Sequence, residues 1–190
     1  MLANIREEQN TDVREVKYTR TALYNRLAAA AAPREQSITR LAIVGREDAE
    51  LAIMVRRART FTSAYGAAIG MLDPQTGQMV CCARSGYSSP EIGSILRGEG
   101  TLIGLCVKQR VELRCDDATT DPRIEMHTVQ GLGVRSMVVA PMTREKQIIG
   151  VLAVFAPSTN AFTFTHVAML KTIADQIVFF LRKRRDGQSN

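Results

Sequence analysis

The chain has 190 residues, which is the length of one domain with a short extension. Hydrophobic residues make up 45% and aromatic residues only 5%, with no Trp, so the core must be mostly aliphatic. The longest apolar runs, such as residues 177–181, are far shorter than the roughly 20 residues needed to cross a bilayer. Residues 1–16 mix acids with bases and lack the apolar region of a secretory signal. We therefore expect a soluble cytoplasmic protein with no membrane partner.

The net charge of +6 raises the question of nucleic-acid binding. The basic residues are scattered, apart from Arg56, Arg57 and Arg59 in one predicted helix and residues 182–185 at the end of another. Cations at a helix C-terminus are favoured by the helix dipole alone. Aromatic residues interleaved with the basic ones and a recognition helix are both missing, so the sequence argues against a nucleic-acid partner.

The four cysteines give no sign of a metal site. Cys81 and Cys82 are adjacent, so on a strand they would point to opposite faces. Cys106 and Cys115 form no CxxC motif, and both histidines of the chain are distant in sequence from every cysteine. We predict four free thiols, most of them buried, and no metal.

A helical extension is predicted at the N-terminus, before the domain. Four of its apolar residues have coiled-coil-like spacing: Val13, Val16, Leu23 and Leu27. Pro33 stops the run of alanines that follows them. We divide the chain into a helical extension at residues 1–45, a domain at 46–184 and a basic, polar tail at 185–190.

The domain is predicted to open with a helix from about Glu47 to Tyr65, ended by Gly66. Its apolar face holds residues at helical spacing: Leu51, Met54, Val55, Ala58, Thr62 and Tyr65. Ile53 lies on the opposite side. A hairpin follows, with strands at residues 67–73 and 78–84 joined by a Pro- and Gly-containing turn.

Two short helices are predicted next. Ser88 or Ser89 can cap a helix opened by Pro90, and Thr101 is placed to cap a helix over residues 102–108.

The second half of the domain begins with an extended piece at residues 111–114 and an acidic loop at 115–123. A helical turn is expected near residues 125–130. Two apolar strands follow at 134–142 and 147–156, and their composition predicts burial on both faces.

A final helix is predicted over residues 165–184. One stripe of it is wide enough to cover a sheet: Val167, Leu170, Ile173, Ala174, Ile177 and Leu181. Met169, Phe179 and Phe180 fall outside this stripe and need another surface to cover them. Either the N-terminal helices of the same chain cover them, or they form a homodimer interface together with Ile53. We favour the homodimer, because small modules with surplus helix faces usually close in twofold pairs.

The order of these motifs resembles that of a GAF domain over about residues 47–183. The likeness depends on six segments, each weak alone: AAIGMLD at 67–73 with the turn at 76–77, GEGTLIG at 98–104, Asp117 with DPR at 121–123, LGVRSMVVAP at 132–141, IGVL at 149–152 and AFT at 161–163.

The resemblance implies an α+β, GAF/PAS-like fold with a central antiparallel sheet. The first and last long helices would pack on one face, and loops and short helices between residues 97 and 140 would enclose a pocket on the other. GAF domains usually bind cyclic nucleotides, other small metabolites, tetrapyrroles or metal centres, or act as dimerising relays. We therefore expect a non-catalytic sensory or regulatory domain that binds a small ligand or relays a signal as a homodimer. The sequence identifies no cofactor and no downstream signalling partner.

Two known ligand classes match the motifs poorly. Tetrapyrrole pockets of phytochromes use a Cys followed by His, or an Asp-Ile-Pro signature, and this chain has neither. The Asn-Lys-Phe-Asp-Glu signature of the cyclic-GMP branch is also missing. A cyclic nucleotide would depend on the helix N-terminus at Thr101 and on either Arg135 or Ser136, because strand alternation lets only one of that pair face inward.

The enzymatic alternative is free methionine-(R)-sulfoxide reductase, a GAF-fold activity that uses cysteine redox chemistry. This chain resembles that family in having two thiols near the Gly loop, with Cys106 after the loop and Cys115 nearby. In that family, however, the Cys lies inside the loop as Gly-Val-Cys-Gly, so both cysteines here are out of register. A further alternative is a degenerate domain that only dimerises.

The resemblance also suggests a polar lining for the pocket, from strand ends and loops that converge in this fold: Arg84, Thr101, Asp116, Asp121, His127 and Ser136. For the aspartates, including Asp117, we favour a structural role, in which carboxylates accept hydrogen bonds within a turn-rich loop. For His127 we favour a surface or lid position over a ligand contact.

Overall fold

The computed structural model describes residues 48–125 and 131–188. Its elements in chain order are α3 (Ala49–Phe61), β1 (Gly66–Leu72), β2 (Met79–Gly86), β3 (Ile95–Leu96), α4 (Leu102–Gln109), β4 (Leu113–Cys115), β5 (Ser136–Arg144), β6 (Gln147–Ala156) and α5 (Phe164–Gln188). The helical extension predicted at residues 1–45 lies outside the described residues, as does most of the helical turn predicted at 125–130.

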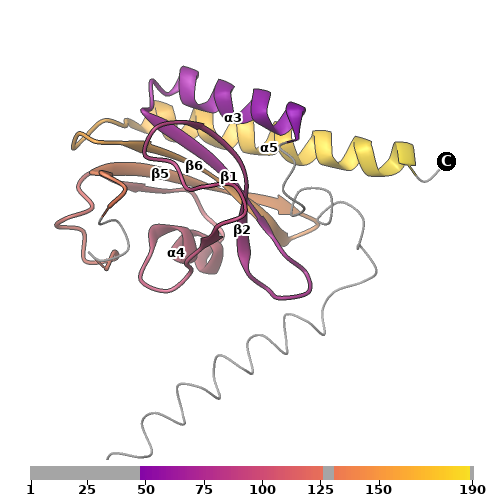
Figure 1. Cartoon of the computed structure of the whole chain (residues 1–190), viewed down its shortest axis with the longest axis horizontal. Helices are drawn as coiled ribbons and strands as arrows, with labels where there is room; N and C mark the ends of the chain where they lie inside the picture. The colour runs from indigo at the N-terminus through magenta and orange to yellow at the C-terminus, as the bar shows by residue number, and fades with distance from the viewer. Residues whose placement is uncertain (1–47, 126–130, 189–190) are drawn as a thin grey trace, which may run out of the picture.

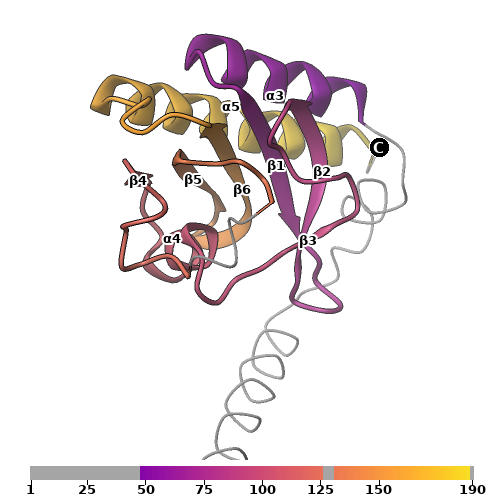
Figure 2. The ribbon, with the colours of Figure 1, turned by 60° about the vertical axis from the view of Figure 1, so that its left-hand side comes forward.

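The strands form one sheet in the order β3-β2-β1-β6-β5-β4, and every neighbouring pair is antiparallel. The helices α3 and α5 cover one face, while α4 and the connecting loops cover the other (Figures 1 and 2). The predicted α+β layering is confirmed. The two apolar strands predicted at 134–142 and 147–156 are β5 and β6, and both are mostly buried.

Side-chain alternation along the strands divides the core into two clusters. On β5, Val138 and Ala140 pack towards the helices α3 and α5, whereas Met137 and Val139 pack towards α4. We call these the helix-side cluster and the pocket-side cluster.

The helix α3 is capped by Asp48, whose carboxylate accepts hydrogen bonds from the backbone amides of Glu50 and Leu51 at 3.1 and 3.4 Å. The same carboxylate contacts Arg184 of α5. The start of α3 therefore lies beside the end of α5, and the two helices run antiparallel.

The end of α3 differs from the prediction. The helix stops at Phe61 rather than Tyr65, and Ser63 turns the chain with a left-handed φ of 51°. Gly66 was expected to end the helix but instead begins β1. Glycine is required there for packing, because a Cβ would overlap the carbonyl oxygen of Tyr87.

The predicted hairpin is confirmed as β1 and β2. Its turn is held by Asp73, whose carboxylate accepts hydrogen bonds from the Gln75 amide at 2.9 Å and the Thr76 hydroxyl at 2.8 Å.

The short helix predicted after Pro90 is wrong. The segment instead runs alongside β2: the Gly93 amide donates to the Cys81 carbonyl at 2.8 Å, and the Cys81 amide donates to the Ser94 carbonyl at 2.9 Å. Gly93 has a φ of 85°, which an α-helix does not allow. These bonds lead into β3, the edge strand beside β2.

The predicted stripe of α5 is confirmed. Five of its six residues are buried against the sheet, namely Leu170, Ile173, Ala174, Ile177 and Leu181, and Val167 is partly buried. By length and hydropathy alone, Phe164–Arg184 would also suffice to cross a membrane. In this fold its apolar stripe is used to cover the sheet.

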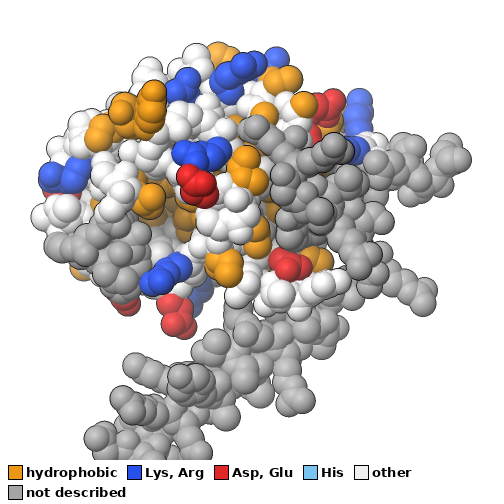
Figure 3. Space-filling model, in the orientation of Figure 1, with side chains coloured by type: hydrophobic (Ala, Val, Ile, Leu, Met, Phe, Trp, Pro, Cys, Tyr) orange, Lys and Arg blue, Asp and Glu red, His pale blue; other side chains and the backbone are white. Residues whose placement is uncertain are grey.

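Large apolar side chains remain exposed on the helix layer. Phe179 is 59% exposed and Ile53 is 41% exposed, while Met169 and Phe180 are half-buried. In Figure 3, apolar side chains emerge along the top of the molecule, over α3 and α5, and alternate there with basic ones.

Candidate functional site

A pocket of about 210 Å³ lies on the α4 side of the sheet. Its floor is made by Met137 of β5 and Phe155 of β6, which come from the two longest strands. Around them stand residues of the β3 segment, of the first turn of α4 and of the loop before β5: Pro90, Ser94, Ile95, Leu96, Arg97, Thr101, Leu102, Ile103, Ile124, Leu132 and Val134. The expected pocket is therefore present in the predicted layer.

Thr101 fixes the wall formed by α4. Its hydroxyl oxygen accepts from the Gly104 amide at 3.1 Å, and the hydroxyl donates to the Arg97 carbonyl at 2.7 Å. The first bond caps the helix, as predicted, and the second folds the segment 97–100 back over it. Gly104 allows this fold, because a Cβ there would overlap the carbonyl oxygen of Gly98.

The acidic loop is tied to the same part of the pocket. The Glu125 amide donates to the Gly100 carbonyl at 2.8 Å. The preceding residue, Ile124, is 8% exposed and lines the pocket. The end of the acidic loop is thus joined to the segment that leads into α4.

Of the six predicted lining residues, Thr101 lines the pocket. Arg84 lies elsewhere: its guanidinium donates to the Ser89 hydroxyl at 3.2 Å and to the Glu91 carboxylate at 3.1 Å. His127 lies outside the described residues.

The position expected for Ser136 needs correction. Its hydroxyl donates to the Ser158 carbonyl at 2.7 Å, and the residue is fully buried. Strand alternation places it on the same face of β5 as Val138, so Met137 is the residue that enters the pocket. Arg135 does not line the pocket either, because it pairs with Asp117 at 2.9 Å.

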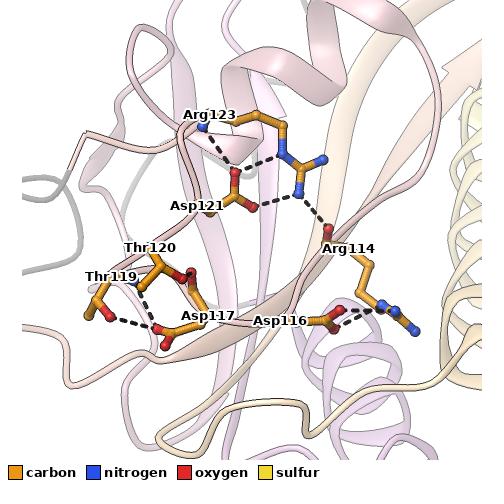
Figure 4. A network of polar contacts seen from close by, with 7 residues as sticks. All are labelled: Arg114, Asp116, Asp117, Thr119, Thr120, Asp121 and Arg123. Carbon is orange, nitrogen blue, oxygen red and sulfur yellow. Dashed lines mark hydrogen bonds and ion pairs between the residues drawn. The ribbon is translucent and has the colours of Figure 1, made fainter.

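Asp116 and Asp121 also stay out of the pocket: Asp116 pairs with Arg114 of β4, and Asp121 pairs with Arg123 of its own loop (Figure 4). Arg123 donates to both carboxylate oxygens of Asp121, at 2.8 and 2.6 Å, and to the backbone carbonyl of Arg114 at 2.8 Å. These hydrogen bonds lower the pKa of Asp121 to about 2.

Asp117 has a comparable set of partners. Hydrogen bonds from Arg135 and from Thr119 hold the pKa of this carboxyl well below its usual range. The contacts of the three aspartates agree with the structural interpretation of the loop.

All four cysteines are free and buried, as predicted. Cys82 belongs to the helix-side cluster, and Cys81, Cys106 and Cys115 belong to the pocket-side cluster, so the predicted division of the adjacent pair is confirmed. None of them lines the pocket. Burial raises the pKa of the Cys81 thiol to about 11 and those of Cys106 and Cys115 to about 12. Within residues 48–125 and 131–188, no group of three potential metal ligands occurs.

Sequence reasoning missed Arg97 and Ser94 as lining residues. Both lie within the segment that was expected to be helical, between Pro90 and Gly98, and this segment instead pairs with β2 and lines the pocket. The alternation of side chains along β5 would have predicted Met137 as a lining residue, but only once the face of the strand that points to the pocket was known.

Comparisons with known proteins agree with this architecture. A family model described as GAF domain matches residues 46–182. The chain is similar to the GAF domain of a phosphoenolpyruvate-protein phosphotransferase from Coxiella burnetii, with 18% identity, a TM-score of 0.65 and coverage of 95% of this chain and 100% of the other. It is also similar to the free methionine-R-sulfoxide reductase from Neisseria meningitidis in complex with its substrate, with 16% identity, a TM-score of 0.64 and coverage of 83% and 96%.

A third similar structure is the GAF domain of an Acinetobacter phosphoenolpyruvate-protein phosphotransferase, with 20% identity, a TM-score of 0.61 and coverage of 74% and 84%. At these identities the likeness shows a shared fold. A search of curated proteins found no match. The family model spans most of the described sheet and both long helices, and on this basis the chain belongs to the GAF domain family.

Proposed function

We propose that this chain is a non-catalytic, cytoplasmic sensory or regulatory domain that binds a small ligand in the pocket beneath α4 and relays its presence through a homodimer. The observation that carries the proposal is the pocket itself, which lies between the central strands and α4 and is lined mainly by apolar side chains. Concave, largely apolar pockets with a few polar groups are the usual form of small-molecule sites.

The size of the pocket narrows the choice of ligand. Its volume of about 210 Å³ lies below the range of about 300–1,000 Å³ typical of sites for drug-sized ligands. This favours a small metabolite over a cyclic nucleotide or a tetrapyrrole. Covalent tetrapyrrole attachment is disfavoured further, because no cysteine lines the pocket.

The helix layer supports the homodimer. Ile53 and Phe179 expose apolar surface on α3 and α5, and Met169 and Phe180 lie half-buried beside it. The helix α5 also packs on β5, whose Met137 forms part of the pocket floor. A ligand that shifts β5 would thereby act on the helix that we place at the dimer interface.

The alternative activity, reduction of free methionine sulfoxide, has weaker support. It needs a thiolate that reaches the substrate, and the raised pKa values of Cys106 and Cys115 keep both thiols protonated at neutral pH. We expect the native protein to react slowly with a thiol reagent such as dithionitrobenzoate and all four thiols to react after unfolding. Rapid labelling of Cys106 or Cys115, together with thioredoxin-coupled turnover of free methionine sulfoxide, would restore the enzymatic alternative.

Ligand-observed NMR with a metabolite library tests ligand binding. Ile95 lines the pocket and is 55% exposed, so Ile95→Trp can fill the space with little cost in folding. Val111 is 45% exposed and does not line the pocket, so Val111→Trp is the matched control. Compounds that bind the wild type and Val111→Trp but not Ile95→Trp support the proposal. If no compound binds, or if the compounds that bind also bind Ile95→Trp, the ligand site is contradicted. The remaining alternative is then a domain that only dimerises.

A further inference from the structure

The polar groups of the pocket gather on one wall. Among the described lining residues, Ser94, Arg97 and Thr101 are the polar ones, and all three belong to the segment 94–101. The floor, with Met137 and Phe155, is apolar. A molecule that fills the pocket therefore meets polar groups at one end and apolar side chains along its body.

The hydroxyl groups of two of these residues already donate hydrogen bonds to backbone carbonyls. The Ser94 hydroxyl donates to the Glu91 carbonyl at 2.6 Å, and the Thr101 hydroxyl donates to the Arg97 carbonyl at 2.7 Å. Arg97 is different: it is exposed, and within residues 48–125 and 131–188 no carboxylate pairs with its guanidinium. Of the three side chains, Arg97 is thus the one with donors to offer to a ligand.

No acidic side chain counters this charge inside the pocket. None of the described lining residues is Asp or Glu, and Glu99 and Glu125, which flank the pocket segments in sequence, do not line it. The loop acids Asp116, Asp117 and Asp121 are each paired with an arginine. Among the described lining residues, a cationic ligand would find no carboxylate partner, whereas an anionic one would find a guanidinium.

We propose that the pocket binds a small molecule with a single carboxylate and an apolar body, such as an aromatic or short aliphatic acid. This inference rests on the proposed function, because it assumes that the pocket is a ligand site. The carboxylate lies at Arg97, and the body packs on Met137 and Phe155. The volume of about 210 Å³, below the range typical of drug-sized ligands, suits a single ring or a short chain.

Isothermal titration calorimetry with three probes tests this assignment. Phenylacetate, 2-phenylethanol and phenethylamine share one ring and differ in charge. We expect the acid to bind the full chain most tightly and the amine most weakly. Arg97→Gln should weaken phenylacetate up to about fivefold and leave 2-phenylethanol unchanged, since one ion pair at an exposed side chain is lost. Arg56→Gln is the matched control, because it removes the same charge from an exposed site on α3, on the other face of the sheet.

The outcomes separate this inference from the proposed function. If the amine binds as tightly as the acid, or Arg97→Gln leaves phenylacetate binding unchanged, the assignment to carboxylates is overturned. A pocket site then still stands if binding is lost in Ile95→Trp. If none of the three probes binds, the assignment is again overturned, and the proposed function falls with it only when the metabolite library also yields no pocket-dependent binder.

Discussion

At the scale of single residues, Asp121 shows why an acidic loop beside a pocket does not have to serve a ligand. Its side chain is 9% exposed and accepts three hydrogen bonds from Arg123, one from the backbone amide and two from the guanidinium. A carboxylate held in this way is fixed within its own loop, and Asp121 does not line the pocket. Its role is to fold the segment that ends at Ile124, which does line the pocket.

Asp121→Asn is expected to lower the free energy of unfolding by about 1–2 kcal/mol at pH 7, because it removes a charge-assisted pair from a largely buried site. The folded pKa of about 2 lies below the ordinary value of 3.8. The stabilisation is therefore fully present above about pH 5 and is lost as the pH falls through the folded pKa. Urea unfolding at several pH values should show the gap between wild type and variant narrowing below about pH 4.

Asp116→Asn is the control for this measurement. Its side chain is 44% exposed in the pair with Arg114, so its loss should cost at most about 0.5 kcal/mol. Equal costs for the two variants, or a cost for Asp121→Asn that does not change with pH, would contradict the role given to the Arg123 pair.

The sequence predicted individual site residues only in part. Thr101 was identified because an N-cap has a local signature, namely a hydroxyl before an apolar run. Ser136 was misplaced because its orientation depends on the register of β5 against the helices, which no local pattern specifies. Arg97 was missed because its position follows from the pairing of the preceding segment with β2, a tertiary contact.

At the scale of elements, α4 depends on a close approach between two glycines. Gly104 lies inside the helix, where alanine is ordinarily favoured over glycine by about 1 kcal/mol. A Cβ at this position would overlap the Gly98 carbonyl, however, and the surroundings of Gly98 itself are open. Substitution of Gly104 by alanine therefore sets a gain in helix propensity against a loss in tertiary packing, whereas the same substitution at Gly98 causes no overlap.

Gly104→Ala is expected to destabilise the protein by a net amount of about 1–2 kcal/mol, because overpacking costs more than helix propensity gains. Gly98→Ala should be nearly neutral, since nothing lies within 4 Å of its added Cβ. Thermal unfolding of both variants tests this. A Gly104→Ala protein that melts above the wild type would show that the segment 97–100 does not pack on α4 as described.

Most long elements were predictable, since their apolar periodicity reports the side that faces the core. The stripe of α5 and the two-faced burial of β5 and β6 are examples. The short elements were harder to predict from the sequence. The segment after Pro90 carries helix-start signals, yet its backbone pairs with β2, and this tertiary contact overrides the local preference.

At the scale of the whole molecule, the layered antiparallel fold was predicted from the order of motifs, because each motif matches one step of the family pattern. The proposed association of two copies has no such motif behind it. It rests on the exposed apolar residues of α3 and α5, for which we propose a second copy as the partner.

Ile53→Asp combined with Phe179→Asp is expected to convert the protein from a dimer to a monomer, because both charges would be buried in the proposed interface. Size-exclusion chromatography with light scattering would show the mass fall from two chains to one, with unchanged circular dichroism. Tyr87→Asp is the control, because Tyr87 is 71% exposed and follows β2, so it belongs to neither α3 nor α5. A monomeric wild type, or a dimer that survives the double substitution, would remove the homodimer from the proposed function.

The most direct test of the central claim, a ligand site on one side of the sheet, is methyl NMR with carbon-13-labelled methionine. Met137 lines the pocket, while Met142 is fully buried on the other face of the same strand. Addition of phenylacetate is predicted to shift the Met137 methyl signal and leave that of Met142 nearly unchanged. Equal shifts of both signals, or no shift at Met137 with phenylacetate or with any binder from the metabolite library, would contradict the account.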